Sequence, residues 1–297
     1  MDHKRWISTL PPETLAALST RSDRAGLLRL AGHLGAIAAA STVIVAGPPG
    51  WWLVLPAQGV LLIVLFTLLH ETVHFTPFRS RWLNVAAGHL AGLVLLIPPH
   101  WFRYFHLAHH RHTHDPALDP ELAAPKPATP GAYAWHLMGL QVWGMSLATL
   151  LRNTAGRAED PFLPVRAWGR VRAEARVMLL LYAGLGTFSS VAGSTLILWL
   201  WVVPVLFGQP FLRLYLLAEH GQCPHVANVF ENTRTTFTNR AVRWLAWNMP
   251  YHAEHHALPT VPFHRLPDLH RLTRPHLGET APGYRAFHAD YRAALRT

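Results

Sequence analysis

Residues 27–74 read LLRLAGHLGAIAAASTVIVAGPPGWWLVLPAQGVLLIVLFTLLHETVH. Two apolar runs, 27–46 and 51–69, are each close to the roughly 20 residues that a helix needs to cross a bilayer. The GPPG sequence between them favours a tight turn. This stretch therefore predicts a hairpin of two transmembrane helices, and its second helix ends in a pair of histidines, His70 and His74.

The composition of the whole chain supports a membrane protein. Of its 297 residues, 51% are hydrophobic and only 14% are charged, whereas a soluble domain has roughly 25% charged residues. The net charge is +10, but no basic helix carries interleaved aromatic residues, so nucleic acid is not an expected partner. The single cysteine, Cys223, excludes a disulfide framework, a thiolate zinc cluster and an iron–sulfur cluster of the chain's own. Any redox partner must therefore come from outside.

Four further apolar runs follow the first hairpin. Runs 177–192 and 195–217 are long enough to predict a second transmembrane hairpin. Runs 84–99 and 133–151 are ambiguous, because the first is short and the second is interrupted by polar residues, among them His136, and by glycines. The first 26 residues lack the layout of a secretory signal peptide.

Nine histidines form three boxes and one isolated position. The boxes are HETVH, HLAHH and HAEHH, and the isolated histidine lies in LLAEHGQC. Residues three or four apart share one face of a helix, and neutral imidazole is the commonest metal ligand. The boxes therefore predict a site for a pair of metal ions. The nine positions are His70, His74, His106, His109, His110, His220, His252, His255 and His256.

A shared metal site constrains the topology, because the number of membrane crossings between any two boxes must then be even. Runs 84–99 and 133–151 are therefore expected to lie in the interface, or to dip into the membrane and return. The connections predicted on the far side, 47–50 and 193–194, contain none of the 26 Lys and Arg residues. The positive-inside rule then assigns the metal site and both termini to the cytoplasm. We expect an all-α integral membrane protein with four transmembrane helices in two hairpins, two interfacial helices, and a cytoplasmic helical cap at 218–297 that holds the dimetal site.

Two other functions compete for the same residues. HETVH matches the zinc-protease pattern H-E-x-x-H, in which Glu71 would be the general base, but that function leaves the other boxes and His220 unused. In the dimetal interpretation Glu71 either supports a ligand or faces away. A metal transporter should carry ionisable residues in mid-membrane, and the two hairpins carry almost none beyond His33.

Polar residues near the boxes are expected to orient the ligating imidazoles. His112 and His114 are additional ligand candidates, and the alternative is that they are solvated or hydrogen-bonded to a nearby aspartate. His33, His89 and His136 are expected to be hydrogen-bonded core residues. The candidates for orienting residues are Asp115, Asp119, Asn248 and Glu254.

The order HETVH, HLAHH, His220 and NMPYHAEHH resembles the membrane fatty acid desaturase and hydroxylase superfamily. The similarity covers essentially the whole chain, including ALPTVPFHRLPDLH after the last box. It implies a non-haem diiron enzyme that uses O2 as co-substrate, with about four transmembrane helices and a cytoplasmic metal cap in which the nine histidines bind iron. The first box has three residues between its histidines, as in many lipid desaturases and alkane hydroxylases. Leu216 stands where the animal acyl-CoA desaturases have an Asn, so an acyl-CoA substrate is not transferred to this chain.

The activity expected from this resemblance is oxygen-dependent desaturation of a fatty acyl chain. A hydroxylase or ketolase of the same fold, acting on an alkane, a sphingolipid or a carotenoid, is the alternative, because the outcome depends on where the substrate carbon lies relative to the metals. The aromatic stretch WFRYFH at 101–106 would either line an apolar substrate tunnel or belong to the interfacial belt. Arg103, Arg111 and Arg213 would either hold a phosphate or carboxylate head group or anchor to anionic lipid.

Electrons must be supplied by a separate protein. We expect a ferredoxin, a rubredoxin or a small cytochrome, with its reductase, to dock on the basic cytoplasmic face. The alternative is that the arginines of this face serve only topology and lipid contact. Arg is more abundant than Lys, and Ala is frequent, which points to a bacterial source. The expected location is therefore a bacterial inner membrane. The arginines concerned are Arg265, Arg271, Arg274 and Arg285.

Overall fold

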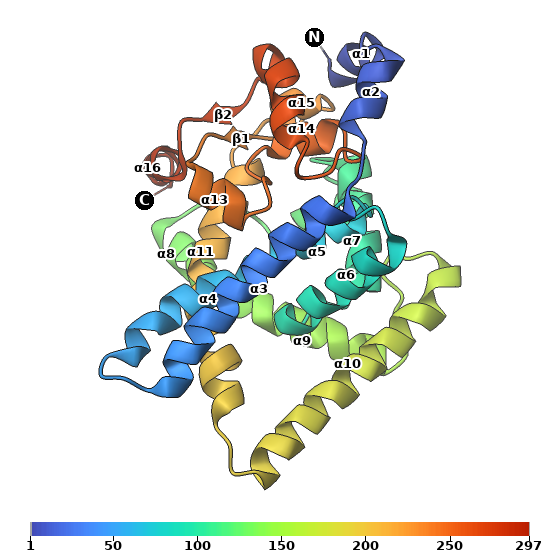
Figure 1. The fold of residues 1–297 in the computed structure, drawn as a ribbon. Helices are drawn as coiled ribbons and strands as arrows, with labels where there is room; N and C mark the ends of the chain where they lie inside the picture. Colours follow the sequence, from blue (N-terminus) through green and yellow to red (C-terminus); the bar gives the residue numbers. More distant parts are fainter. Residues whose placement is uncertain (1, 297) are drawn as a thin grey trace.

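The computed structural model describes residues 2–296 and is mainly helical (Figure 1). The strands β1 (Thr235–Thr236) and β2 (Thr280–Ala281) form one short parallel pair. The predicted all-α class agrees with this architecture. The helices are α1 (His3–Ser8), α2 (Pro12–Leu18), α3 (Asp23–Ala46), α4 (Leu55–Ile63), α5 (Leu65–Val73), α6 (Arg81–Leu95), α7 (Pro99–His112), α8 (Pro130–Met138), α9 (Leu140–Thr154), α10 (Val165–Val191), α11 (Val203–His220), α12 (Val229–Asn232), α13 (Arg240–Leu245), α14 (His252–Ala257), α15 (Leu266–Thr273) and α16 (Tyr284–Ala293), with 3₁₀ turns at Trp51–Val54, Pro120–Ala123 and Arg274–His276 and a π-helical turn at Leu198–Val202.

Three helical segments are long and apolar enough to cross a membrane, namely Pro12–Ala46, Trp51–Val73 and Leu198–His220. The first two contain the predicted hairpin 27–46 and 51–69 and are joined at Gly47, which adopts the left-handed conformation that a helix C-terminus favours. These segments support a membrane protein.

The predicted third span, 177–192, forms the second half of α10, which does not meet the same criterion of length and hydropathy. The first half of α10 carries Arg170, Arg172, Glu174 and Arg176, so its apolar part is short. Four transmembrane helices therefore remain a prediction.

The predicted second hairpin is open. α10 packs against α9 and α7, α11 packs against α4, and the two helices diverge from their connecting turn (Figure 1). Tyr182 of α10 and Trp201, in the π-helical turn, stack with their ring centroids 5.9 Å apart. Each also donates a hydrogen bond to a backbone carbonyl near the end of α6, Tyr182 to Leu93 and Trp201 to Val94. The end of α6 thus contacts both α10 and the π-helical turn that precedes α11.

α4 and α11 are in direct backbone contact at a pair of glycines. A Cβ atom on Gly59 would lie 2.0 Å from the Pro204 carbonyl oxygen, and one on Gly208 would lie 2.2 Å from the carbonyl oxygen of Gly59. Only glycine permits such an approach, which is common where helices pack in membranes. Because α5 follows α4 directly, this contact also fixes α5 relative to α11.

Of the two runs that were expected to form interfacial helices, 84–99 lies mainly in one helix, α6, and 133–151 is divided into two helices. α6 ends at Leu95 and is followed by Leu96, which is left-handed, and α7 starts at Pro99, so that the two helices meet at an angle of 96°. Together they could form one broken span or a re-entrant loop. Run 133–151 divides into α8 and α9 at Gly139, whose φ is +66°, and a Cβ atom there would lie 2.1 Å from the Gln209 side chain. Placement of these helices in the interface remains a prediction.

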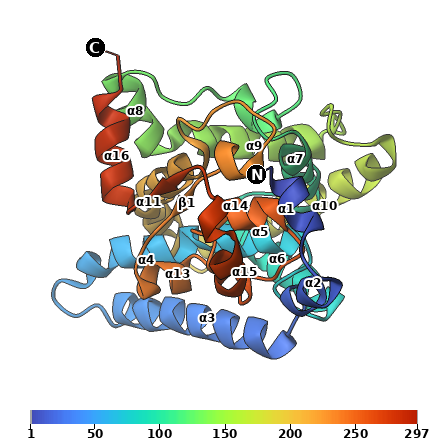
Figure 2. The ribbon, with the colours of Figure 1, turned by 90° about the horizontal axis from the view of Figure 1, so that it is seen from above.

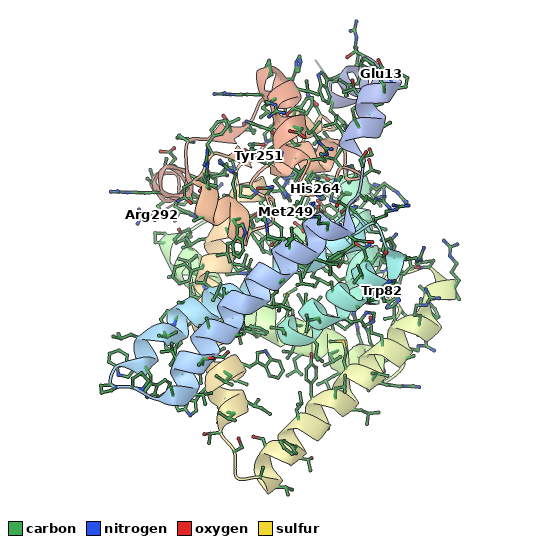
Figure 3. The ribbon with its side chains drawn as sticks, in the orientation of Figure 1. Glu13, Trp82, Met249, Tyr251, His264 and Arg292 are labelled. Carbon is green, nitrogen blue, oxygen red and sulfur yellow. The ribbon has the colours of Figure 1, made fainter. Side chains whose placement is uncertain are left out.

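The segments after α11 lie together on one end of the helices, and we call them the cap (Figure 1). The cytoplasmic position of this cap remains a prediction. Figure 2 shows α14 over α5 near the centre of the molecule, and Figure 3 shows Met249 and Tyr251 inside the cap, whereas Trp82 projects outward from α6 and is 69% exposed. The sequence did not indicate that α1 also joins the cap. Trp6 of α1 packs edge-on against Phe230, with a centroid separation of 5.6 Å.

Candidate metal centre

Four elements bring the nine histidines of the boxes to one place. α5 carries His70 and ends at His74, α7 carries the HLAHH box, α11 ends at His220, and α14 carries the HAEHH box. The i, i+3 and i, i+4 spacings turn the histidines of each helix to one side, as the sequence predicted. α6 and the bend before α7 return the chain to the end of α5. As a result, the ring centroids of His70 and His106 lie only 4.2 Å apart.

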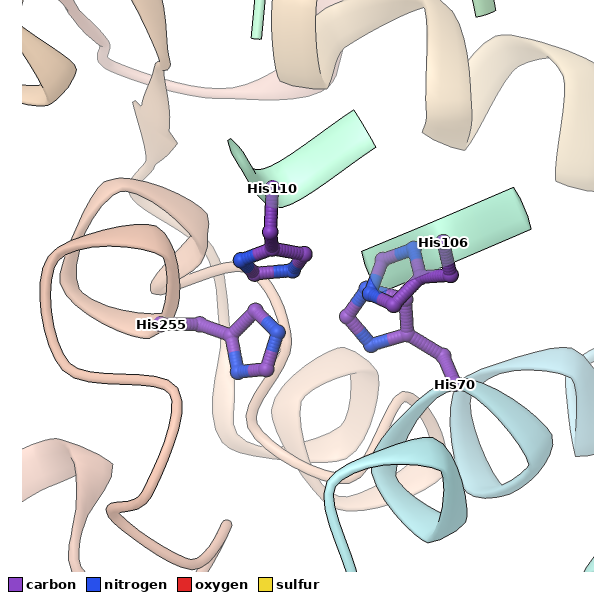
Figure 4. Close-up of side chains that lie close together, drawn as sticks. All are labelled: His70, His106, His110 and His255. Carbon is purple, nitrogen blue, oxygen red and sulfur yellow. The ribbon is translucent and has the colours of Figure 1, made fainter. Parts of the chain in front are cut away.

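The first group consists of His70, His106, His110 and His255 (Figure 4). Each offers one ring nitrogen, and these four atoms lie within 4.8 Å of one another. His74 adjoins this group, because its Nε2 atom lies 3.1 Å from Nε2 of His106. Four imidazoles from three helices therefore surround one point, and a fifth lies beside them.

The second group consists of His109, His220 and His256, whose ligand atoms also lie within 4.8 Å of one another. The Nε2 atoms of His109 and His252 each lie 3.2 Å from Nε2 of His220, so His252 completes a set of four. The rings of His110 and His256 stack at 4.0 Å and join the two groups. The nine histidines thus form two adjoining groups, which suit two metal ions.

Burial keeps His74 and the three histidines of the HAEHH box neutral, whereas at His109 burial is outweighed by Glu121 and Asp119, which raise the pKa. Burial lowers the pKa of His74 to about 3, with Arg103 adding a smaller effect. Burial, followed by repulsion from neighbouring imidazoles, lowers the pKa of His252, His255 and His256 well below the ordinary value for histidine. Neutral rings have a nitrogen lone pair available for a cation at physiological pH.

The ring nitrogens themselves show that the groups fit metal ions. Both nitrogens of His70 and His255, and Nε2 of His110 and His256, are buried without any hydrogen-bond partner in residues 2–296. Unpaired buried polar atoms are costly and rare in proteins, and two Nε2 atoms that face each other compete for one proton. Transition-metal ions would satisfy these nitrogens, and an all-imidazole donor set suits iron, zinc or copper.

The second group is supported from behind, because the Nδ1 atom of each ring lies within 3.4 Å of an oxygen, although the contact between His252 and Glu219 is not a hydrogen bond. Such contacts orient a ligating imidazole and leave Nε2 for the metal. The oxygens are Asp119 Oδ1 at 3.0 Å from His109, the Asn232 carbonyl at 3.2 Å from His220, Glu219 Oε1 at 3.3 Å from His252 and Thr113 Oγ1 at 3.4 Å from His256.

Asp119 is the best anchored of these partners. Its second carboxylate oxygen accepts the backbone N–H of His114 at 2.8 Å. Burial raises the pKa of Asp119, but the hydrogen bonds from His109 and from backbone N–H groups outweigh burial and leave the pKa below its ordinary value. Asp119 therefore remains an anion that holds the His109 ring. Glu219 was not anticipated as a support for His252, although a carboxylate directly before the isolated His220 was visible in the sequence.

Glu71 lies behind the first group and does not take the position of a protease base. Its Oε1 atom is 3.7 Å from Nδ1 of His255, while Oε2 accepts hydrogen bonds from Thr76 and from the Phe263 backbone N–H. His70 of the same box is surrounded by imidazoles from the other boxes. This arrangement favours the dimetal interpretation of HETVH over the protease one.

Two of the other expected orienting residues instead support backbone segments near the boxes. Asp115 accepts the backbone N–H groups of Ala117 and Leu118, and so caps a turn. Asn248, in the left-handed conformation, donates to the Phe263 carbonyl at 2.9 Å. Because the Phe263 N–H binds Glu71, Asn248 reaches His255 only through this chain of contacts.

Glu254 is fully buried but is engaged with residues of the cap. It accepts hydrogen bonds from Thr235, His270 and Thr273. In the described part of the chain it forms no hydrogen bond with the nine histidines, so it ties α14 to β1 and α15.

The remaining histidines divide into paired and unpaired rings. His33 is a hydrogen-bonded core residue as expected, with Nε2 2.8 Å from the Leu61 carbonyl. His114 is buried beside His220 at a centroid distance of 5.4 Å, and neither of its ring nitrogens has a partner in the described residues. Burial lowers the pKa of His114 to about 4, so it remains a candidate for a further ligand.

A cavity of about 260 Å³ opens beside the two groups. One side is formed by His70, His106, His109 and His252, and much of the remaining wall is apolar. Phe102 and Phe105 of the WFRYFH stretch lie in this wall, whereas Trp101 does not, since its indole N–H donates to Asp160 at 2.7 Å. A small apolar molecule in the cavity would contact the histidines directly.

Comparison with known proteins identifies the family of this chain. The family model described as "Fatty acid desaturase" matches residues 48–288. The dihydrorhizobitoxine desaturase of Bradyrhizobium elkanii is 27% identical to this chain over 72% of the chain and 65% of the relative. The Delta(12)-fatty-acid desaturase of Arabidopsis thaliana is 25% identical over 80% of the chain and 64% of the relative.

A third relative is the sn-1 acyl-lipid omega-3 desaturase (ferredoxin) of Nostoc sp. (strain 36), which is 35% identical over 22% of the chain and 17% of the relative. The matched stretches therefore cover less than two thirds of each of these three proteins.

Proposed function

The chain belongs to the fatty acid desaturase family, and from this premise we propose that it is an oxygen-dependent diiron enzyme that introduces a double bond into a fatty acyl chain at the cytoplasmic face of a membrane. Membership makes it a desaturase-like oxidoreductase. The observation that carries the more specific proposal is the convergence of nine histidines into two groups whose buried nitrogens lack other partners.

The nine histidines would hold the two irons, five imidazoles around one ion and four around the other. Bound iron would supply the activation of dioxygen that removes two hydrogens from adjacent carbons. The overall reaction balances as –CH2–CH2– + O2 + 2 e⁻ + 2 H⁺ → –CH=CH– + 2 H2O. The chain itself must orient the imidazoles, position the substrate carbon and exclude water.

Individual residues support these three tasks. Asp119 holds the ring of His109 through a hydrogen bond, and Glu219 lies 3.3 Å behind the ring of His252. Phe66 and Phe102, with centroids 5.5 Å apart, form an apolar wall next to the first group and would keep a hydrocarbon chain dry. The substrate carbon would thus approach the metals from the cavity rather than from bulk solvent.

The two electrons would come from a ferredoxin, a rubredoxin or a small cytochrome with its reductase. One relative carries "ferredoxin" in its name, which supports this class of donor. Arg271, Arg274 and Arg285 are exposed on the cap and would meet an acidic partner. The predicted topology places this cap in the cytoplasm of a bacterial cell, with the helices in the inner membrane.

Metal analysis and lipid profiling together test the proposal. Purified protein should contain two irons per chain. Cells that express the chain with a ferredoxin and its reductase should accumulate a lipid that is lighter by two hydrogens. A product heavier by one oxygen would assign the chain to hydroxylation instead, and a single zinc without oxygen consumption would refute the diiron proposal.

A further inference from the structure

The cavity beside the metal centre contains charged and polar groups that catalysis on a plain hydrocarbon does not require. One of its walls is α11, which contributes Gln209, Leu212, Arg213 and Leu216. Of these, Gln209 and Arg213 are spaced i, i+4 and therefore share a face of the helix. This polar pair lies in a helix that is otherwise apolar enough to span a membrane.

Arg213 forms no salt bridge within residues 2–296, although Glu121 and Glu219 lie near enough to interact with its charge. Its Nε atom is buried without a hydrogen-bond partner in these residues. The two carboxylates of the cavity face imidazoles instead, Glu219 at 3.3 Å from His252 and Glu121 at 3.8 Å from His109. An unpaired guanidinium in a membrane helix is costly and marks a binding function.

Other groups of the cavity are also left without partners. Gln209 is 2% exposed, and its Oε1 atom has no hydrogen-bond partner in the part of the chain described. The Nε2 atom of His136, from α8, is likewise buried and unpaired. Lys126, at the cavity wall, forms no ion pair with a carboxylate among the described residues. A ligand with hydrogen-bonding oxygens would satisfy several of these groups at once.

Arg213 lies at a fixed distance from the histidines that would bind the metals. Arg213 precedes His220 by seven residues, which is about two helical turns or roughly 10 Å along the axis. Leu216 of α11, Phe66 and Phe102 give the cavity an apolar wall. A bound molecule can therefore place a polar head at Arg213 and an apolar chain against the metal centre.

We infer that the substrate is an amphiphile whose oxyanion head, a carboxylate or a phosphate, binds Arg213 inside the cavity while its apolar chain extends to the histidines. This inference rests on the proposed function, since it specifies the molecule that the same centre oxidises. Arginine suits this role because its guanidinium pairs with carboxylate and phosphate oxygens in two-point contacts. The cavity volume of about 260 Å³ suits a compact amphiphile.

Equilibrium binding of tritiated decanoate to the iron-loaded protein in detergent tests the inference. Decyl phosphate and 1-decanol serve as competitors, which distinguishes a carboxylate, a phosphate and a neutral head. The wild-type protein should bind decanoate or decyl phosphate roughly tenfold or more tightly than 1-decanol. Arg213→Gln should abolish this preference, with roughly 10- to 100-fold weaker binding of the preferred anion, and Arg213→Lys should restore part of it.

Arg170→Gln is the matched control, because Arg170 is an exposed arginine of α10 outside the cavity. It should leave all affinities unchanged, and Arg213→Gln should still contain two irons. Equal affinity of the wild-type protein for decanoate, decyl phosphate and 1-decanol would overturn the inference, as would an unchanged preference in Arg213→Gln. Absence of iron and of oxygen consumption in the wild-type protein would instead overturn the proposed function.

Discussion

Two histidine clusters of this protein have similarly close ligand atoms but differ in the hydrogen-bond partners of their ring nitrogens. The nine-histidine centre holds imidazoles whose nitrogens are buried and unpaired or face one another. The second cluster joins His89 and His100, on either side of the α6–α7 bend, to Glu174 of α10. There Nε2 of His89 lies 3.1 Å and Nδ1 of His100 lies 2.7 Å from the same carboxylate oxygen.

The difference shows that distance between potential ligands is a weaker guide to a metal site than the partners of each nitrogen. Every ligand set in question lies within 4.8 Å. In the cluster at Glu174, however, the carboxylate accepts both histidines and also the backbone N–H of His100, and Nδ1 of His89 bonds to the Val85 carbonyl. These contacts are complete without a cation, so we interpret this cluster as a tie between α10 and the bent helix pair.

Removal of one histidine should have the largest effect on iron content and should distinguish the two clusters directly. His255→Ala removes an imidazole that contacts both His70 and His110, and we expect loss of both irons and of all oxygen-dependent activity. His89→Ala should keep two irons per chain, as measured by metal analysis of protein of equal purity. Iron loss in His89→Ala that matches the loss in His255→Ala would contradict the distinction.

Removal of a supporting carboxylate should have a smaller effect on the centre. Asp119→Asn keeps the size of the side chain but weakens the contact to His109, and the affinity for iron should fall roughly 10- to 100-fold. Competition with a chelator of known affinity measures this change. Asp115→Asn is the control, since Asp115 caps a turn and contacts no ligand ring; equal affinities in the two variants would show that Asp119 does not support the metal.

Removal of the carboxylate from the other cluster should affect stability alone. Glu174→Gln weakens the hydrogen bonds to His89 and His100, and we expect a loss of about 1–3 kcal/mol in the free energy of unfolding with both irons retained. The thermal unfolding midpoint gives the change, with the exposed Glu159→Gln as reference. An unaltered midpoint, or loss of iron, would argue against a structural tie.

Acid should weaken the same tie over a narrow range of pH, and this is the smallest expected effect. Burial raises the pKa of Glu174, but the hydrogen bonds to His100 and His89 outweigh burial and place the pKa below the ordinary value of 4.5. A lowered carboxylate pKa contributes stability above pH 4.5 that is lost as pH falls through the folded-state pKa. The difference in unfolding midpoint between wild type and Glu174→Gln should therefore shrink below pH 4.5, and a difference that grows would refute this sign.

The spacing of the boxes predicted which histidines meet, because helix periodicity is local. It could not show that Glu219 lies behind His252, since that contact depends on the packing of α11 against the cap. Asp119 was a candidate from its nearness to the second box, and Asp115 and Asn248 were candidates by the same argument. The structure separates them by their contacts, which nearness in sequence does not determine.

Hydropathy predicted the first hairpin well because both helices are apolar along their length. It was less informative for α10, where the helix starts at Val165 and its charged first half forms the tie at Glu174. Run 133–151 was expected to be one helix, and Gly139 breaks it by adopting the left-handed conformation, at a position where the Gln209 side chain leaves no space for a Cβ atom. Such breaks arise from long-range contacts that one sequence does not reveal.

The backbone contact between Gly59 and Gly208 acts as a spacer for the two metal groups. One glycine belongs to the helix that continues into the carrier of His70, and the other lies in the helix that ends at His220. A single added methyl group would push these carriers apart without touching any ligand. In the proposed diiron enzyme, the absence of a side chain several turns away would thus set the separation of the two ions, and with it the choice of which bond in a substrate they reach.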